Sequence, residues 1–492
     1  MPGGSSSLGI GVNADGAVVV GYGDGTGFGQ HAFRWTSAGM EDLGTMPGGS
    51  YSLGYGVSAD GTAVVGYGDG TGFSQHAFRW TSAGMEDLGT LPGGTSSLML
   101  WGVSADGAVV VGYGDGTGFG NHAFRWTAAT GMRDLNTLLA DAGVNMTGIT
   151  LDAAYDVSAN GQFIVGQGNF SGATHAYIVR YFDNEGTPIA GLTTPGAVQE
   201  SINGLGDARF GLMAQEHGLA VPLLGDNQPI KQGNEAGVFG TAGSAQGGGY
   251  SRVGLMPGLA LLTGAAYGSA EFENAAIDDS FIGAAALRYV KPNPGRWHPF
   301  AEGGGWFAPD ADLKFERTYM NGAGTATGTG RTEGDVSYVF ARGGLVFDLG
   351  PRHQLALSAE LGREWLDVDG YSEPLSAKNP FEANVASGTD TMDLAKARAQ
   401  WSFGLSQRFD ATLWAAAVYG FNQKSELIAA VTGVGTFVPV IDDETVWAEY
   451  GARIGYAVTE AVTLDLFFDG VSGEEDEIAT RVHGGAGLRY RF

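Results

Sequence analysis

Residues 483–492 read HGGAGLRYRF, and apolar and polar side chains alternate along them. Leu488, Tyr490 and Phe492 project to one side of an extended chain, and the arginines between them project to the other. The pattern predicts a strand with one apolar and one charged face. Such a strand fits a soluble sandwich, which buries its apolar face, or a membrane barrel, which turns that face to lipid. Alternation alone leaves both folds open.

The same alternation recurs from about residue 235 to the end of the chain. Val462, Leu464, Leu466 and Phe468 share a face, with aspartates opposite. We predict twelve strands from this pattern: 236–245, 249–255, 259–272, 280–290, 297–307, 335–349, 354–371, 393–408, 412–423, 445–457, 462–472 and 479–492.

The connections between these strands separate the two folds. The only long connections lie near 308–334, 372–392 and 424–444, and they alternate along the chain with tight ones. Short and long connections therefore fall at opposite ends of an even-numbered sheet, as in membrane barrels. The tight connections are 256–258, 291–296, 349–353, 408–411 and 458–461. We predict a closed 12-stranded antiparallel transmembrane β-barrel over residues 235–492.

In such a barrel the charged faces line the lumen. Glu449 and Arg453 lie opposite Tyr450 and Ile454 on one strand, and Arg398 lies on the polar face of another. We predict that Arg398, Glu449 and Arg453 form hydrogen-bonded networks inside the lumen.

A helix is predicted at about 195–217, in a linker over 191–234. Thr194 suits the N-cap and Pro195 the first helical position. The helix is long enough to cross a bilayer, but its charges make it unsuitable for lipid. A helix threaded through a polar pore satisfies both facts, and a surface helix joining two domains is the alternative. The charged residues are Glu200, Asp207, Arg209 and Glu216.

Residues 1–190 repeat. The string VSADGTAVVGYGDGTGFSQHAFRWTSAGMEDLGT begins at Val57, and close copies begin at Val12 and Val103 with a looser one at Val157. About four units of 45–54 residues, each with three or four strands, predict a propeller-like or otherwise stacked β array. Residues 1–4, MPGG, match the motif that links two later units, so we expect an upstream part with a signal peptide.

Each of the first three repeats carries a GYGDGTG loop, and its aspartate invites a functional interpretation. Asp24, Asp69 and Asp115 are candidate Ca²⁺ ligands, because hard cations prefer oxygen. The plainer interpretation is a turn residue. The aligned histidines are expected to be structural, because each unit contributes one: His31, His76, His122 and His175.

Composition excludes several functions. The net charge of −27 opposes nucleic-acid binding, and the absence of Cys excludes disulfides and thiol catalysis. Neither a GxSxG nor an HExxH motif occurs, so we expect no enzymatic activity and no cofactor.

The C-terminal part, closing on GLRYRF at 487–492, resembles the translocator β-domain of autotransporters (type V secretion). The HAFRW units resemble the HAF repeats of predicted extracellular proteins, a family without an agreed activity. The resemblance implies a barrel in the bacterial outer membrane that carries residues 1–190 as a passenger to the cell surface. It also implies an assembly signal formed by Leu488, Tyr490 and Phe492.

The implied partners are outer-membrane lipid, the barrel-assembly machinery, periplasmic chaperones and a surface ligand bound in adhesion. Two alternatives remain. One is an outer-membrane pore with an accessory repeat domain, and the other is a secreted soluble β enzyme.

Overall fold

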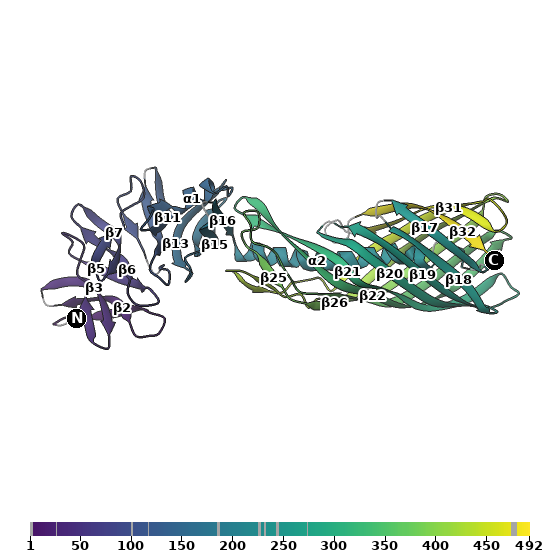
Figure 1. The fold of residues 1–492 in the computed structure, drawn as a ribbon, viewed down its shortest axis with the longest axis horizontal. Helices are drawn as coiled ribbons and strands as arrows, with labels where there is room; N and C mark the ends of the chain where they lie inside the picture. The colour runs from purple at the N-terminus through teal and green to yellow at the C-terminus, as the bar shows by residue number, and fades with distance from the viewer. Residues whose placement is uncertain are drawn as a thin grey trace.

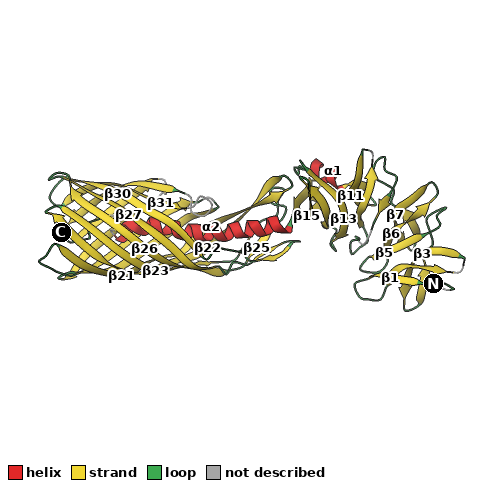
Figure 2. Ribbon diagram, turned by 180° about the vertical axis from the view of Figure 1, so that it is seen from behind, coloured by secondary structure: helices red, strands yellow, loops and turns green. Residues whose placement is uncertain are grey.

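The computed structural model describes residues 3–492 except 26, 100–101, 117, 185–186, 225–227, 231–232, 243–245, 273 and 474–479. Small β-sheets lie at one end of the molecule and a long barrel at the other (Figure 1). The helix α2 (Pro195–Ala220) runs from the small sheets into the barrel, as Figure 2 shows. The predicted all-β architecture with one long linker helix is confirmed.

Twelve antiparallel strands close into the barrel, which confirms the prediction. The strands, in their order around the barrel, are β17 (Glu235–Ala242), β18 (Gln246–Met256), β19 (Leu259–Glu271), β20 (Ala275–Val290), β21 (Trp297–Asn321), β22 (Gly324–Gly350), β23 (His353–Val368), β26 (Gly388–Gly404), β27 (Phe409–Lys424), β30 (Glu444–Ala457), β31 (Val462–Gly473) and β32 (Arg481–Arg491).

The C-terminal segment makes the closing seam. Strand β32 pairs with β17 on one side and β31 on the other, so that Leu488 lies opposite both Val238 and Leu464. Every strand therefore has two neighbours, and no edge is left with unpaired backbone groups.

Side-chain facing excludes the soluble sandwich. Leu466 is 62% exposed, and Ile454 and Leu488 also lie on the outer surface. Glu449 and Arg453 point inward and are buried. An apolar exterior with a charged interior is the inverse of a soluble β protein, and it is the arrangement that lipid requires.

The long connections are more ordered than the sequence indicated. Residues 308–334, predicted as a loop, continue β21 and β22 and turn only between Asn321 and Gly324. Strands β24 (Tyr371–Ser372), β25 (Ala383–Val385), β28 (Ala429–Val431) and β29 (Gly435–Phe437) form a second small sheet. We call residues 311–334, 371–385 and 429–437 together the collar.

The collar folds because its aromatic side chains pack together. Phe315 stacks on Tyr371, with ring centroids 5.9 Å apart, and Tyr319 meets Phe381 edge-on at 6.1 Å. These contacts place the collar in the same apolar core as the buried residues of α2. The prediction of a loop over 308–334 was wrong, because contacts with aromatic residues far along the chain hold this segment as strand.

Helix α2 begins as predicted. The amide of Ala197 donates to Thr194 Oγ1 over 3.2 Å, which is the N-cap contact. The helix contacts β20, β21, β23, β26 and β31, so barrel wall surrounds it. Val198, Ile202 and Leu205 are buried against that wall. The short helix η1 (Val221–Leu224) continues toward the start of β17.

Residues 7–193 form four units, each an antiparallel sheet of four strands in chain order. Unit 1 contains β1 (Ser7–Val12), β2 (Val19–Gly25), β3 (Phe28–Thr36) and β4 (Gly39–Asp42). Unit 2 contains β5 (Ser52–Val57), β6 (Val64–Gly70), β7 (Phe73–Thr81) and β8 (Gly84–Asp87). Unit 3 contains β9 (Ser97–Leu98), β10 (Val109–Gly116), β11 (Phe119–Thr127) and β12 (Gly131–Asp134), followed by α1 (Leu135–Asp141). Unit 4 contains β13 (Ile149–Val157), β14 (Phe163–Phe170), β15 (Ala173–Asn184) and β16 (Thr187–Thr193).

The units stack in an open row, and Figure 1 shows unit 1 at the end remote from unit 4. Consecutive units contact through β2 and β5, β7 and β9, and β10 and β13. The expectation of a stacked array therefore holds, but its propeller-like form is not what the structure contains. A propeller must return its last blade to its first, whereas here unit 4 packs on the collar.

Candidate functional site

The candidate site is the barrel lumen, with the helix that fills it and the two mouths that open it. Among the described residues, neither helix combines the length and hydropathy that a membrane-spanning helix needs.

Arg209 is the most deeply buried of the three predicted helix charges whose side chains the structure describes. Its Nε lies 3.1 Å from Asp390 Oδ2, with both side chains withdrawn from solvent. Its guanidinium also lies over the ring of Phe315, 5.8 Å from the centroid. Asp390 is held in turn by the Ser425 hydroxyl, which donates to its Oδ1 over 2.7 Å. Helix, barrel strand and collar therefore meet at one ion pair.

The other helix charges do not share this environment. Glu200 is exposed near the long-loop mouth, and Asp207 is half-buried. The expectation that both lie in the lumen beside Arg209 is therefore not met in full, because the helix begins above the wall, within the collar. The side chain of Glu216 lies outside the described residues.

A second buried pair ties the helix to the collar. Arg317 of β21 pairs with Glu373, with Nη2 and Oε2 2.6 Å apart. Its Nη1 donates to Ser201 Oγ of α2 over 3.4 Å, and its Nη2 donates to the carbonyl of Phe381 over 2.6 Å. One guanidinium thus joins helix, wall and collar.

A charge ladder crosses the wall below the helix. Glu449 pairs with Lys396 at 2.7 Å, and Lys396 lies 4.0 Å from Glu360. The ladder continues through Arg342 and Glu302 to Arg288, with Glu302 2.8 Å from Arg342 and 2.6 Å from Arg288. Alternating signs on neighbouring strands hold the wall together and leave each charge balanced.

The other two predicted wall residues join separate contacts. Arg453 lies 2.6 Å from Asp465 and 2.8 Å from Asp410. Arg398 stacks over the Trp414 ring at 4.2 Å. The structure therefore brings Glu449 into the ladder but not Arg398 or Arg453. Four further members of the ladder were not predicted: Arg288, Glu302, Arg342 and Glu360. Each alternates with apolar neighbours in the sequence, and this signal would have assigned it to the inward face.

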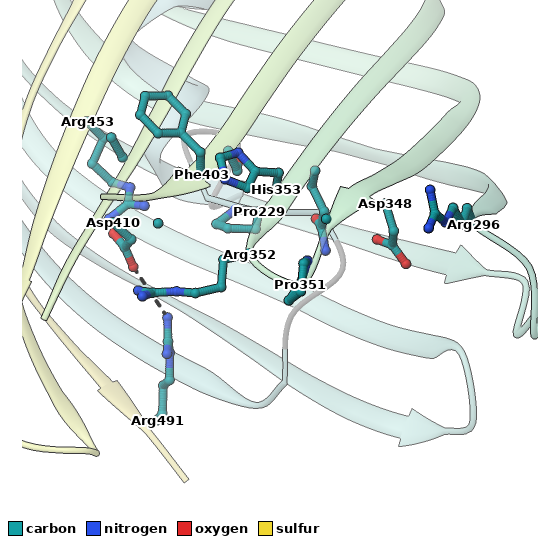
Figure 3. Close-up of a pocket in the computed structure, with 15 residues that line it drawn as sticks. Pro229, Arg296, Asp348, Pro351, Arg352, His353, Phe403, Asp410, Arg453 and Arg491 are labelled. Atoms are coloured by element: carbon teal, nitrogen blue, oxygen red, sulfur yellow. Dashed lines mark ion pairs between the residues drawn. The ribbon is translucent and has the colours of Figure 1, made fainter. Parts of the chain in front are cut away.

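The short-turn mouth holds a cavity of about 670 Å³ (Figure 3). Arg352, Arg453 and Arg491 line it, and Asp410 lies 2.8 Å from Arg453 and 3.8 Å from Arg491. Pro229, from the segment between the helix and β17, also lines the cavity. The side-chain amide of Gln400 in the wall donates to the backbone carbonyl of Gln228 over 2.7 Å. The chain that leaves the helix is therefore fastened to the wall at this mouth.

At the opposite mouth, unit 4 sits on the collar. The amide of Gly322 donates to Leu192 O, and the amide of Leu192 donates to Asn321 Oδ1, each over 2.8 Å. Arg180 pairs with Glu382 and donates to the carbonyl of Pro380 over 2.9 Å. These contacts come from two different parts of the collar, so unit 4 covers this mouth.

The repeat aspartates take part in local hydrogen bonds. Asp69 accepts from the Ser50 amide and hydroxyl, each over 2.7 Å. Asp24 accepts in the same way from Ser5 and Ser6, and Asp115 from Thr95 and Ser96. Each carboxylate therefore fastens its hairpin to the segment before it. Among the described residues there is no group of three or more His, Asp or Glu side chains arranged for a metal ion.

The repeat histidines are bound within their own units. Nδ1 of His31 lies 3.0 Å from Asp42, Nδ1 of His76 lies 3.0 Å from Asp87, and Nδ1 of His122 lies 2.8 Å from Asp134. Each pair links the third and fourth strands of a sheet.

No family model and no curated protein matches this chain. Among solved structures, the translocator domain of the autotransporter NalP from Neisseria meningitidis is similar at 15% identity with a TM-score of 0.41. That match covers 58% of this chain and 98% of that one. The β domain of the Bordetella autotransporter BrkA is similar at 16% identity and a TM-score of 0.31, covering 53% and 99%. The NanC porin is similar at 10% identity and 0.27, covering 53% and 100%.

These likenesses concern the barrel. The chain is a membrane-type β-barrel of twelve strands, closed around a charged helix and covered at its long-loop mouth by the last repeat unit.

Proposed function

We propose that this protein is an outer-membrane autotransporter, whose barrel translocates and then anchors the repeat units at the bacterial cell surface. The observation that carries the proposal is the path of α2. It connects unit 4 at the long-loop mouth with β17 at the short-turn mouth, through the inside of a closed barrel.

The path has a topological consequence. Once the barrel is in the membrane, its wall is sealed by backbone hydrogen bonds and α2 cannot enter from the side. The repeat units and the two barrel termini, Glu235 and Arg491, then lie on opposite sides of the bilayer. Since long loops face outward in bacterial barrels, the units are on the cell surface.

Ion pairs and apolar burial hold the helix inside the lumen. The Arg209–Asp390 and Arg317–Glu373 pairs and the burial of Ile202 fasten it to the wall. An anchored end state favours retention of the repeat units, which would act in adhesion to a surface ligand and not in catalysis. Lipid surrounds the apolar belt, and barrel-assembly machinery with periplasmic chaperones would recognise the terminal strand.

The pore hypothesis predicts an open lumen, which fits less well with this helix. The helix occupies the axis and unit 4 covers one mouth, so steady conductance is expected to be low. Conductance before and after removal of the helix distinguishes an open pore from a translocator whose lumen is filled.

Protease digestion of intact cells tests the proposal. The full chain, produced with a signal peptide in an outer-membrane-containing bacterium, should lose its repeat units to added protease while the barrel resists. The control is digestion after the outer membrane has been permeabilised. Any additional cuts should then lie only at the short-turn side of the barrel. Repeat units that resist protease until permeabilisation would contradict the proposed orientation.

A further inference from the structure

Three junctions in the row of units use the same contacts. The Ala-Asp-Gly turn of each unit meets the corresponding turn of the next: Ala14 N donates to Ala59 O over 3.3 Å, Ala59 N to Ala105 O over 3.0 Å, and Ala105 N to Ala159 O over 3.0 Å. We call the surface that accepts these bonds the leading face of a unit, and the surface that donates them its trailing face.

Side chains repeat the same polarity. Arg34 Nε of unit 1 donates to Gly61 O of unit 2 over 2.9 Å, and Arg79 Nε of unit 2 donates to Gly107 O of unit 3 over 2.8 Å. The amide of Ala32 donates to Ser52 Oγ over 2.9 Å. In each of these bonds the leading face supplies the acceptor and the trailing face supplies the donor.

Close approach at the junctions requires glycine. A Cβ on Gly61 would lie 2.5 Å from Val18 Cγ2 of the unit before it, and one on Gly107 would lie 2.6 Å from Ala63 Cβ. Gly161 meets Val109 in the same way at 2.8 Å. The glycine of this turn is thus a contact point for the preceding unit as well as a turn residue.

Unit 1 carries the same leading face with nothing on it among the described residues. A Cβ on Gly16 would meet nothing within 4 Å. Ser7 is exposed, whereas its equivalents Ser52 and Ser97 are fully buried. Val12 is 60% exposed, whereas its equivalent Val57 packs against the core between units 1 and 2.

We infer that the leading face of unit 1 is a docking surface for the trailing face of a further repeat unit of the same type. Stacked repeats need a polar terminal unit or a neighbour on each apolar face, and unit 1 presents a junction surface instead of a polar cap. The inference concerns the repeat row and does not depend on how the barrel functions.

The donor and acceptor polarity identifies the occupant. Two leading faces placed together would oppose acceptors to acceptors, so a second copy cannot dock head to head with the same bonds. The trailing faces of units 1, 2 and 3 are covered by the next unit, and that of unit 4 by the collar. Only an additional unit has a free trailing face.

The contact between unit 4 and the collar has the same local geometry as the junctions between units, although the collar is not a repeat unit. Phe163 of unit 4 stands where Val18 stands in unit 1, and Gly433 of the collar lies against its ring. Gly433 has φ +76, close to the +72 of Gly61, and a Cβ there would collide with Phe163. A positive-φ glycine therefore meets the trailing face in both cases.

The experiment lengthens the full chain by one unit. Residues 1–45 are duplicated in front of Met1, so that Thr45 of the added copy joins Met1 as Thr45 joins Met46 in the parent. The chain contains no cysteine, so Val12→Cys in the original unit gives a single label site. We expect its maleimide labelling rate to fall in the lengthened chain to the rate of Val57→Cys in the parent.

A matched variant controls for unspecific shielding. Gly16→Asn keeps a residue that tolerates positive φ but adds a side chain at the contact point. It should leave labelling of Val12→Cys fast in the parent, and restore fast labelling in the lengthened chain.

Three results would overturn the inference. The first is labelling of Val12→Cys in the lengthened chain that stays as fast as in the parent, whether or not the added unit is folded as judged by its resistance to protease. The second is slow labelling that Gly16→Asn does not relieve. The third is slow, concentration-dependent labelling in the parent, which would identify a second copy as the occupant.

Discussion

Arg209 of α2 and Asp390 of β26 form an ion pair inside the lumen, with Nε and Oδ2 3.1 Å apart and neither side chain reached by solvent. The pair joins the helix to a strand of the barrel wall. Its partners are far apart in the chain, so it reports on the seating of the helix.

Removing one partner of this pair should loosen the helix. A buried charge left alone costs about 3–5 kcal/mol, so Arg209→Met or Asp390→Asn should destabilise the seated helix by that order. The double change of Arg209→Met with Asp390→Leu should recover most of the loss, because no charge is then left buried. Protease resistance of the Thr194–Pro195 junction in detergent measures the effect. Equal losses in the single and double variants would exclude charge pairing as the cause.

Removing the helix should open the lumen. A chain beginning at residue 225 lacks the repeat units and α2, whereas a chain beginning at Thr194 lacks only the repeat units. We expect higher single-channel conductance in planar bilayers from the first than from the second, since α2 contacts strands on several sides of the lumen. Equal conductance would mean that the helix does not obstruct the pore.

The outer belt should reject charge. Leu466→Arg, Ile454→Arg or Tyr450→Arg should hinder membrane insertion by about 2–4 kcal/mol near the midplane, because each residue lies on the outer surface. The control is Ser402→Arg, whose side chain borders the cavity at the short-turn mouth. Folding into lipid vesicles, followed by heat-modifiable gel migration, measures insertion. Equal tolerance at inner and outer positions would contradict the facing.

The terminal aromatic should matter for assembly. Phe492 lies on the outer surface and stacks with Tyr490, with ring centroids 6.1 Å apart. Deleting Phe492 should lower the yield of assembled barrel without changing synthesis, if the assembly machinery recognises this end. Phe468→Ala, which removes another outward aromatic, is the control and should assemble normally. Unaltered outer-membrane levels after the deletion would remove the case for a terminal signal.

The repeat row should lose stability in acid. The Ser58 hydroxyl donates to Asp60 over 2.6 Å, and with the Thr62 amide and hydroxyl it lowers the pKa of that carboxyl to about 2 from 3.8. Burial raises the pKa of Asp115, but hydrogen bonds from Ser96 and Thr95 outweigh it and bring the pKa to about 2.

A pKa that is lower in the folded state stabilises the fold above the unfolded value and is lost as pH falls. We therefore expect the repeat units to keep this contribution above about pH 4 and to lose it between about pH 4 and 2. Protease resistance across that range measures the change. Asp60→Asn should flatten the profile, and a profile that is unchanged in this variant would exclude Asp60 as a contributor.

The sequence by itself was enough to establish the strands and their facing. Alternation is a local property, because successive side chains of an extended chain point to opposite sides, so Leu488 and Tyr490 could be assigned to one face without any knowledge of their neighbours. The lengths of the connections then indicated that this face is the outer one. Turn residues set the short connections, and Thr194 with Pro195 set the start of the helix. The period of the repeats also required only the chain.

Which inward charges meet was beyond the reach of the sequence. Arg398 and Arg453 were correctly placed on the inner face, but their contacts depend on strand register and tilt around a closed barrel. Asp390, the partner of Arg209, was not singled out because nothing local distinguishes it from other loop-end aspartates.

The tertiary structure alone decided the collar and the open row of units. Residues 322–334 look like a loop because Gly and Thr are frequent in them, yet 308–334 is mostly strand, because Phe315 and Tyr319 contact aromatic partners far along the chain. A repeat of 45 residues is equally compatible with a ring and a row, since each junction involves only adjacent units. In this structure Gly433 of the collar packs against the trailing face of unit 4, which is the surface that unit 1 would have to contact to close a ring. The units therefore form an open row.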